Sequence, residues 1–192
     1  MEAIRIIQDE HRSLAAVLHG MLFLVHEVKD QGAKPDFAVL GAMVHYIDTV
    51  PERFHHPKED RYLFARLRAR CAEAAPVLDA LHAEHAVCTD KVRALEQALS
   101  RYEHGGAEFY PAFAQAVEDF AAFHWNHMGR EETEVLPLAR AHLSADDWAE
   151  IDAAFKGHTD PLFGADAAAQ QDKLFTRIVN LAPPPIGLGP AT

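Results

Sequence analysis

Two segments of the sequence carry a histidine followed four residues later by a glutamate. These pairs are His55 with Glu59 and His127 with Glu131. If each segment is helical, a step of four residues advances about 6 Å and returns close to the same side of the helix. Each histidine then lies on the same face as its glutamate. An imidazole nitrogen and a carboxylate oxygen in this arrangement can bind one metal ion.

The arrangement is duplicated, because a Glu-His dipeptide precedes each pair at a similar distance. The dipeptides occur at residues 10–11 and 84–85. The segments that begin at the two glutamates, EDRYLFARL (59–67) and EETEVLPLA (131–139), place acids and apolar residues in the same register. We interpret this as a helix hairpin that is present twice. Each copy contributes one histidine from its first helix and a His/Glu pair from its second.

The predicted metal site therefore contains four imidazoles and two carboxylates. These donors suit iron, manganese or zinc better than magnesium or calcium, which prefer shells made only of oxygen. One carboxylate from each half could bridge a pair of ions. Buried without an ion, the same groups would cost several kcal/mol in desolvation or force the acids to bind protons. The predicted ligands are His11, His55, Glu59, His85, His127 and Glu131.

Hydrophobic periodicity predicts four long helices, each with predicted ligands on its apolar stripe. A single histidine on such a stripe is usually a core residue, but six groups on four successive stripes favour a metal site. Pro57 lies inside the second helix, which we expect to be bent but continuous. The helices are expected over residues 3–30, 36–70, 76 to about 100 and 111–142, with Asp36 as an N-cap and a loop over 101–111.

The C-terminal part of the chain predicts smaller elements. ADDWAEIDAAF is expected to form a short helix, with Ser144 as its N-cap and an acid three residues later. A last amphipathic helix is expected over residues 165–181, followed by a Pro-rich tail. The predicted fold is all-α: an antiparallel up-down-up-down four-helix bundle over residues 1–142, with a C-terminal helical appendage and tail over 143–192 packed on the same domain.

Composition argues against several kinds of partner. The net charge is −11 at pH 7 and the chain has no basic cluster, so we expect neither nucleic acid nor an anionic membrane as a partner. No run of about 18 apolar residues could span a bilayer, and the N-terminus lacks the apolar core of a signal peptide. We therefore expect a cytoplasmic protein in which Cys71 and Cys88 are free thiols.

Four motifs lie at corresponding places of the four predicted helices: DEHR (9–12), HHPKEDRYLF (55–64), AEH (83–85) and FHWNHMGREETEVLP (123–137). Together they resemble the hemerythrin-like (HHE cation-binding) family, and the resemblance covers roughly residues 5–142. It implies an antiparallel four-helix bundle around a non-haem centre of two iron ions, held by the six predicted ligands. Members of this family bind dioxygen or nitric oxide, sense iron or oxygen, or help to repair damaged iron centres.

The sequence departs from the family pattern on the third helix. Oxygen-carrying hemerythrins have a second histidine four residues from the first, whereas this chain has Leu81 and Thr89 at those positions. The departure argues against the seven-ligand site of an oxygen carrier. Three further histidines remain open as ligands, because they lie close in sequence to the predicted ones: His56, His82 and His124.

We expect a binding and sensing protein rather than an enzyme, so no catalytic residue is assigned. Its centre would hold two iron ions, with zinc or manganese as possible substitutes. The small ligand would be dioxygen, nitric oxide or peroxide. The first alternative is a di-iron enzyme that reduces oxygen, peroxide or nitric oxide, or that repairs iron–sulfur centres.

A second alternative keeps the fold but not the redox chemistry. It is a metal-stabilised helical interaction domain, whose last helix would contact a protein partner or a second copy of the chain through Leu174, Phe175, Ile178 and Leu181. A ferritin-like di-iron site would need Glu-x-x-His on each of two helices. That motif occurs once, ending at His55, so we do not predict that fold.

Overall fold

The computed structural model describes residues 1–156 and 178–180, and this part of the chain is helical, with no strand. The predicted all-α class is therefore confirmed. Four helical rods follow one another in sequence, and a shorter helix follows the fourth. The first rod is α1 (Glu2–Gln31), the second consists of α2 to α4, and the third is α5 (Ala75–Gly105). The fourth rod consists of α6 (Tyr110–Arg130), η5 (Glu131–Val135) and α7 (Leu136–His142). The shorter helix is α8 (Ala145–Lys156).

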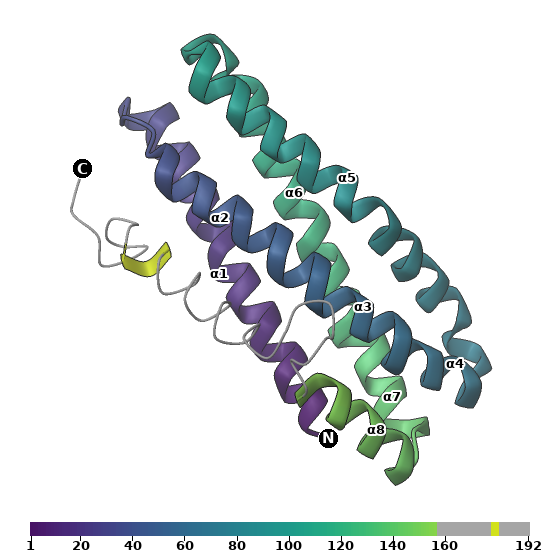
Figure 1. Cartoon of the computed structure of the whole chain (residues 1–192). Coiled ribbons are helices and arrows are strands. Elements are labelled where there is room, and N and C mark those ends of the chain that lie inside the picture. Colours follow the sequence, from purple (N-terminus) through teal and green to yellow (C-terminus); the bar gives the residue numbers. More distant parts are fainter. Residues whose placement is uncertain (157–177, 181–192) are drawn as a thin grey trace.

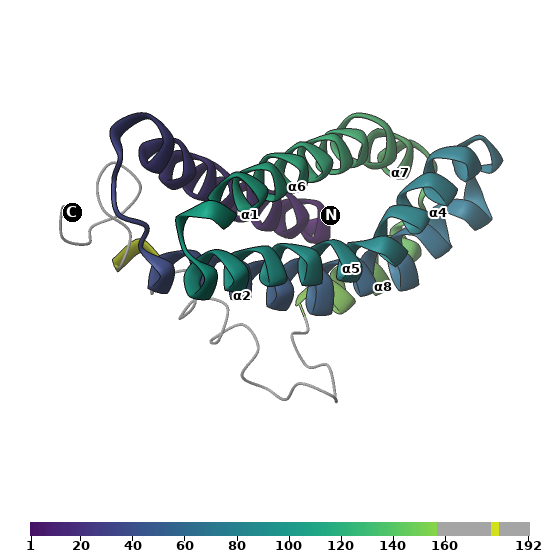
Figure 2. The same ribbon diagram turned by 90° about the horizontal axis from the view of Figure 1, so that it is seen from above.

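The rods pack as a ring in which each lies beside two neighbours. Helix α1 contacts α2 and α6, and α5 contacts the same two helices (Figure 1 and Figure 2). Rods that are joined by a short connection run in opposite directions. The arrangement is therefore an up-down-up-down bundle, as predicted.

The second rod is one continuous helix in which the hydrogen-bonding pattern alternates. Pro57 has no N–H to donate, and in an α-helix its ring would clash with the carbonyl four residues back. It lies at the start of α3, directly after a π-helical turn in which the regular α pattern has already changed. The predicted continuity past Pro57 is confirmed. The rod consists of α2 (Phe37–Val50), η1 (Pro51–His55), α3 (His56–Lys58), η2 (Glu59–Phe64) and α4 (Ala65–Arg70), of which η1 and η2 are π-helical.

Two predicted N-caps are confirmed. The carboxylate of Asp36 accepts hydrogen bonds from the backbone N–H groups of Ala38 and Val39 at 3.1 and 3.0 Å. At α8, the N–H of Ser144 donates to Asp147 Oδ2 at 3.0 Å, and the N–H of Asp147 donates to Ser144 Oγ at 3.2 Å. Both arrangements satisfy N–H groups that have no partner within the first turn of a helix.

The loop predicted over residues 101–111 is wrong over its first half, because α5 continues as far as the residue before Gly106. The buried ring of Tyr102 stacks on Phe113 with centroids 5.7 Å apart, which holds this last turn in the core. The helix ends at Gly106, whose φ of 102° is accessible mainly to glycine. A short 3₁₀ turn, η4 (Ala107–Phe109), then leads into α6.

The hydrophobic core consists of two clusters with a polar layer between them. One cluster fills the half of the bundle near the α1–α2 and α5–α6 connections and includes Leu18 and Phe113. The other lies at the opposite end and includes Ile7 and Leu67. Buried histidines and glutamates come from the helical turns between the two clusters. Burying polar groups costs free energy unless they are compensated, so their concentration in one layer indicates a site.

Helix α8 covers the second cluster. Its side chains Trp148, Ile151 and Phe155 are buried against that cluster. The helix is also tied to the start of α1, because the N–H of Ala3 donates to Asp152 Oδ1 at 2.7 Å. In Figure 1, α8 accordingly passes beside the N-terminus. The second cluster is therefore closed by a helix from outside the four rods.

Most of the predicted C-terminal helix lies outside the described residues. Of residues 165–181, only 178–180 are described, and they are helical. Ile178 is buried against the first core cluster. The predicted Pro-rich tail also lies outside the described residues. None of the helices in residues 1–156 and 178–180 combines the length and the hydrophobicity that a bilayer span requires.

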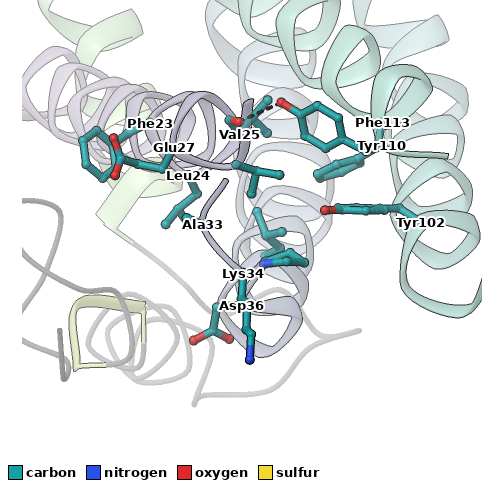
Figure 3. Close-up of a pocket in the computed structure, with 13 residues that line it drawn as sticks. Phe23, Leu24, Val25, Glu27, Ala33, Lys34, Asp36, Tyr102, Tyr110 and Phe113 are labelled. Carbon is teal, nitrogen blue, oxygen red and sulfur yellow. Dashed lines mark hydrogen bonds between the residues drawn. The ribbon is translucent and has the colours of Figure 1, made fainter. Parts of the chain in front are cut away.

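A cavity of about 170 Å³ lies where the α1–α2 connection meets α5 and α6 (Figure 3). The aromatic rings of Tyr102, Tyr110 and Phe113 form part of its wall. The hydroxyl of Tyr110 donates a hydrogen bond to the carbonyl oxygen of Val25 at 2.8 Å. None of the six predicted ligands lines this cavity, so it is separate from the predicted metal site.

Candidate metal centre

All six predicted ligands lie in the polar layer, and they are nearly inaccessible to solvent. The side chain of His85 is 6 % exposed, and those of the other five are 5 % exposed or less. Every rod contributes at least one of the six predicted ligands. Helix α1 supplies His11, the second rod His55 and Glu59, α5 His85, and the fourth rod His127 and Glu131.

A first potential metal position is formed by one histidine pair and two glutamates. Single ligand atoms of His11, His55, Glu59 and Glu131 lie within 4.8 Å of one another. The Nε2 atoms of His11 and His55 are 3.2 Å apart. His11 Nε2 lies 3.2 Å from Glu131 Oε2, and His55 Nε2 lies 3.2 Å from Glu59 Oε1.

The second potential position uses the other histidine pair and the same two glutamates. The Nε2 atoms of His85 and His127 are 3.1 Å apart. His127 Nε2 lies 3.3 Å from Glu131 Oε1, and His85 Nε2 lies 3.6 Å from Glu59 Oε2. Each glutamate therefore directs one oxygen to the first position and its other oxygen to the second. Two carboxylates arranged in this way could bridge a pair of ions.

The donor chemistry fits transition-metal ions. All four carboxylate oxygens of Glu59 and Glu131 are buried, and the imidazole Nε2 atoms that face them lie 3.2–3.6 Å away. Buried carboxylates without compensation are strongly unfavourable. An ion with bonds of about 2.1 Å holds neighbouring ligands about 3 Å apart. The paired Nε2 atoms are 3.1 and 3.2 Å apart, and those of His11, His55 and His127 lie 3.2–3.3 Å from their nearest carboxylate oxygens, which agrees with this spacing. His85 Nε2 is farther from its nearest carboxylate oxygen, at 3.6 Å.

Within each half, the acid of the Glu-His dipeptide supports the histidine of the following helix. Glu10 Oε2 lies 2.7 Å from His55 Nδ1, and Glu84 Oε2 lies 2.8 Å from His127 Nδ1. When Nδ1–H donates to a carboxylate, the ring is held in one orientation and the Nε2 lone pair points inward.

Between the halves, the acid that follows Glu59 or Glu131 supports the remaining histidine. Glu132 Oε1 lies 2.9 Å from His11 Nδ1. Asp60 Oδ1 lies 3.1 Å from His85 Nδ1. Each of the four predicted ligand histidines thus has a carboxylate at its outer nitrogen, and the two halves depend on each other for this support.

The protonation of the imidazoles and that of the carboxylates are linked by electrostatics. Burial alone would lower the pKa of His11, but Glu131 and Glu132 outweigh it and raise that pKa to about 9. At His85, burial is likewise outweighed by Asp60 and Glu131, and the pKa rises to about 9. Burial would raise the pKa of Glu131, but the surrounding imidazoles hold it well below its usual value. Protons on the imidazoles therefore compensate the carboxylates, and a bound cation would replace those protons.

His56, which the sequence left open as a ligand, lies beside the second position. It is 5 % exposed, and its ring stacks on that of His85 with centroids 4.2 Å apart. One nitrogen each of His56, His85 and His127 lies within 4.8 Å of the others. Burial and the neighbouring imidazoles hold the pKa of His56 well below its usual value. A neutral imidazole is the form that binds metals.

The other two open histidines are directed elsewhere. The ring of His82 is 68 % exposed and contacts Asp60 at 3.1 Å. His124 is buried, but its Nδ1–H donates to the carbonyl of Phe120 at 3.1 Å and its Nε2 lies 3.3 Å from Cys88 Sγ. Among the described residues, neither His82 nor His124 belongs to a group of ligand atoms that could hold an ion.

Both potential bridging glutamates begin a π-helical segment. Segment η2 begins at Glu59 and η5 begins at Glu131. Short π-helical segments within α-helices are frequent at functional sites. The duplication seen in the sequence is therefore matched by a duplication of the local backbone. Sequence reasoning missed these segments, because the spacing of His and Glu is also compatible with a regular α-helix.

The fold and the site define a helical-bundle protein with a buried His/Glu cluster that could hold metal. The model of one family, described as the hemerythrin HHE cation binding domain, matches residues 2–139. The match covers most of the chain, which therefore belongs to the hemerythrin HHE cation-binding family and confirms the resemblance seen in the motifs. Searches of curated proteins and of solved structures found no match.

Replacing Glu10 with alanine should weaken metal binding by about 10–100-fold, because a ligand histidine then loses the acceptor that orients it. Glu10 is 8 % exposed and supports His55. Titration of the metal-free protein with Zn²⁺ against a competing chelator measures the change. Asp9→Ala is the matched control, since this neighbouring carboxylate is 41 % exposed and pairs with Arg5 instead. Equal affinities for the Glu10 variant and the wild type would contradict the supporting role.

Proposed function

We propose that the protein binds two iron ions in the polar layer and uses them to bind or sense dioxygen, nitric oxide or peroxide. The observation that carries this proposal is that the two oxygens of Glu59 face different histidine pairs, as do the two oxygens of Glu131. Imidazole and carboxylate donors together suit iron, and zinc or manganese could take its place. Membership in a cation-binding family supports the same choice.

The two metal positions are unequal in this proposal. Two imidazoles, from His11 and His55, face the first position, whereas His85, His127 and His56 surround the second. The first position would therefore keep more coordination sites free for a small ligand. When bound, the iron pair supplies electrons and a place of attachment for that ligand. The supporting carboxylates would hold the rings in place as the charge of the centre changes.

Burial of the centre supports a small ligand rather than an organic substrate. The six predicted ligands are at most 6 % exposed, and apolar clusters lie on both sides of their layer. Such surroundings limit access of bulk water and strengthen electrostatic interactions within the layer. Dioxygen and nitric oxide require much less space in such a layer than an organic substrate would.

Metal analysis followed by optical spectroscopy tests the proposed function. Protein loaded with Fe²⁺ without air should contain about two irons per chain and should develop visible charge-transfer absorption on exposure to dioxygen or nitric oxide. Reversible binding of one ligand per centre supports a binding or sensing role. Repeated turnover of peroxide or nitric oxide by each centre would instead favour the enzyme. Metal-free protein that binds zinc but takes up no iron would overturn the proposal.

A further inference from the structure

A second group of metal-binding side chains lies where the ends of α4 and α7 meet the start of α5. Cys71 is the C-cap of α4, Glu73 lies in the 3₁₀ turn η3 (Ala72–Ala74), and His142 is the last residue of α7. One ligand atom of each residue lies within 4.8 Å of the others. His142 Nε2 is 3.6 Å from Glu73 Oε1.

The three donors define the class of cation. A thiolate, an imidazole and a carboxylate are the three side-chain ligands that zinc uses, and three protein ligands leave one tetrahedral position for water. Magnesium and calcium prefer oxygen shells, so the thiol of Cys71 disfavours them. The donor set also differs from that of the iron centre, where none of the six predicted ligands contains sulfur.

The backbone around Cys71 is held in place. Its N–H donates to the carbonyl of Leu67 at 2.8 Å, and its own carbonyl accepts from the N–H of Ala74 at 3.2 Å. The adjacent Arg70 pairs with Asp147 of α8 at 3.0 Å, which compensates the positive charge next to the thiol. Cys71 and Glu73 thus project from a turn that backbone hydrogen bonds already hold in place, which lowers the entropic cost of binding an ion.

The group is open to solvent and separate from the iron centre. Cys71 is 4 % exposed, whereas the side chains of His142 and Glu73 are 39 % and 71 % exposed. A cation would therefore arrive from solvent and reach the thiol between two accessible ligands. About 12 residues of the continuous second rod separate Glu59 from Cys71, which corresponds to roughly 15–18 Å along the helix.

We propose that Cys71, Glu73 and His142 form a second metal site that takes one zinc-like divalent cation. Binding forms metal–sulfur, metal–nitrogen and metal–oxygen bonds and releases the thiol proton to solvent. The occupied site ties the end of α7 to the α4–α5 turn. Because two of its three ligands are exposed, its ion exchanges with solvent more readily than an ion in the buried centre. The proposal does not depend on the iron centre.

Cobalt distinguishes the two sites, because only a thiolate ligand gives sulfur-to-cobalt charge-transfer absorption in the near-ultraviolet. We expect full-length iron-loaded protein titrated with Co²⁺ to bind about one further cobalt per chain with this absorption, and Zn²⁺ to displace it. Cys71→Ser and His142→Gln should each lose the band. Since His142 is exposed, its variant tests the site without disturbing the core.

Two control variants complete the experiment. Cys88→Ser removes the other cysteine and should keep the band. His104→Gln removes an exposed histidine at the end of α5 and should also keep it. Loss of the band in Cys88→Ser, its survival in Cys71→Ser, or its absence from the wild type would each overturn the proposed site. None of these results would change the iron content that tests the buried centre.

Discussion

Glutamine in place of Glu131 should abolish the paired metal site while leaving the bundle folded. Glutamine has nearly the same shape, but it lacks the charge and the second anionic oxygen that a bridge requires. Glu131 is 1 % exposed, and its oxygens face His11, His127 and His85. We expect the metal content to fall from about two ions per chain to one or fewer, with affinity reduced by more than the roughly 100-fold typical of supporting residues.

Metal analysis after gel filtration, together with far-ultraviolet circular dichroism, checks this result. Glu134→Gln is a close control, because Glu134 is an exposed carboxylate in the same π-helical segment. It should retain both ions. A Glu131 variant that binds two ions with unchanged affinity would show that this residue does not bridge them.

Removing the metal should produce the second large effect, a loss of thermal stability. An ion that binds only the folded chain, at 1,000 times its dissociation constant, contributes about 4 kcal/mol. For a domain of this size that corresponds to a fall in Tm of roughly 8–16 °C. Thermal unfolding of the loaded and chelator-treated protein measures the difference. The Glu131→Gln variant should show little difference between the two, and a wild type with equal Tm in both forms would contradict the predicted stabilisation.

The size of this effect should depend on pH. In the metal-free protein the pKa values of His11 and His85 are raised to about 9. The stabilisation that these protons provide is complete below the ordinary histidine value of 6.5 and is lost as the pH rises through 9. His56 has the opposite effect, because its pKa in the folded protein is well below 6.5. As the pH falls below 6.5, the unfolded chain binds a proton at this residue before the folded chain does, and the folded state loses stability.

The metal-loaded protein should not lose stability over the same interval, because the ion replaces the protons and binds more tightly as the pH rises. The difference in Tm between the loaded and metal-free forms should therefore widen from pH 6.5 to pH 9. Differential scanning calorimetry at several pH values measures it. A difference that narrows over this interval would show that protons on His11 and His85 do not support the metal-free fold.

Much of the centre could be predicted from spacing alone. His55 and Glu59 are four residues apart, as are His127 and Glu131, and helical geometry places each pair on one face whatever its surroundings. Because the His/Glu pair and the Glu-His dipeptide before it both occur twice in the sequence, two similar helix hairpins could be predicted. The predicted N-caps at Asp36 and Ser144 were also local, because a cap involves residues only a few positions apart.

Spacing and periodicity in the sequence were therefore enough to predict the helical class, the order of the rods and the inward position of the polar groups. Tertiary structure decided which atoms meet there. The contact of Glu132 with His11, the stacking of His56 on His85 and the exclusion of His124 all depend on how separate rods are rotated against one another. Periodicity specifies which face of a helix is buried, but not the side chain that packs opposite, because that pairing involves residues distant in the chain.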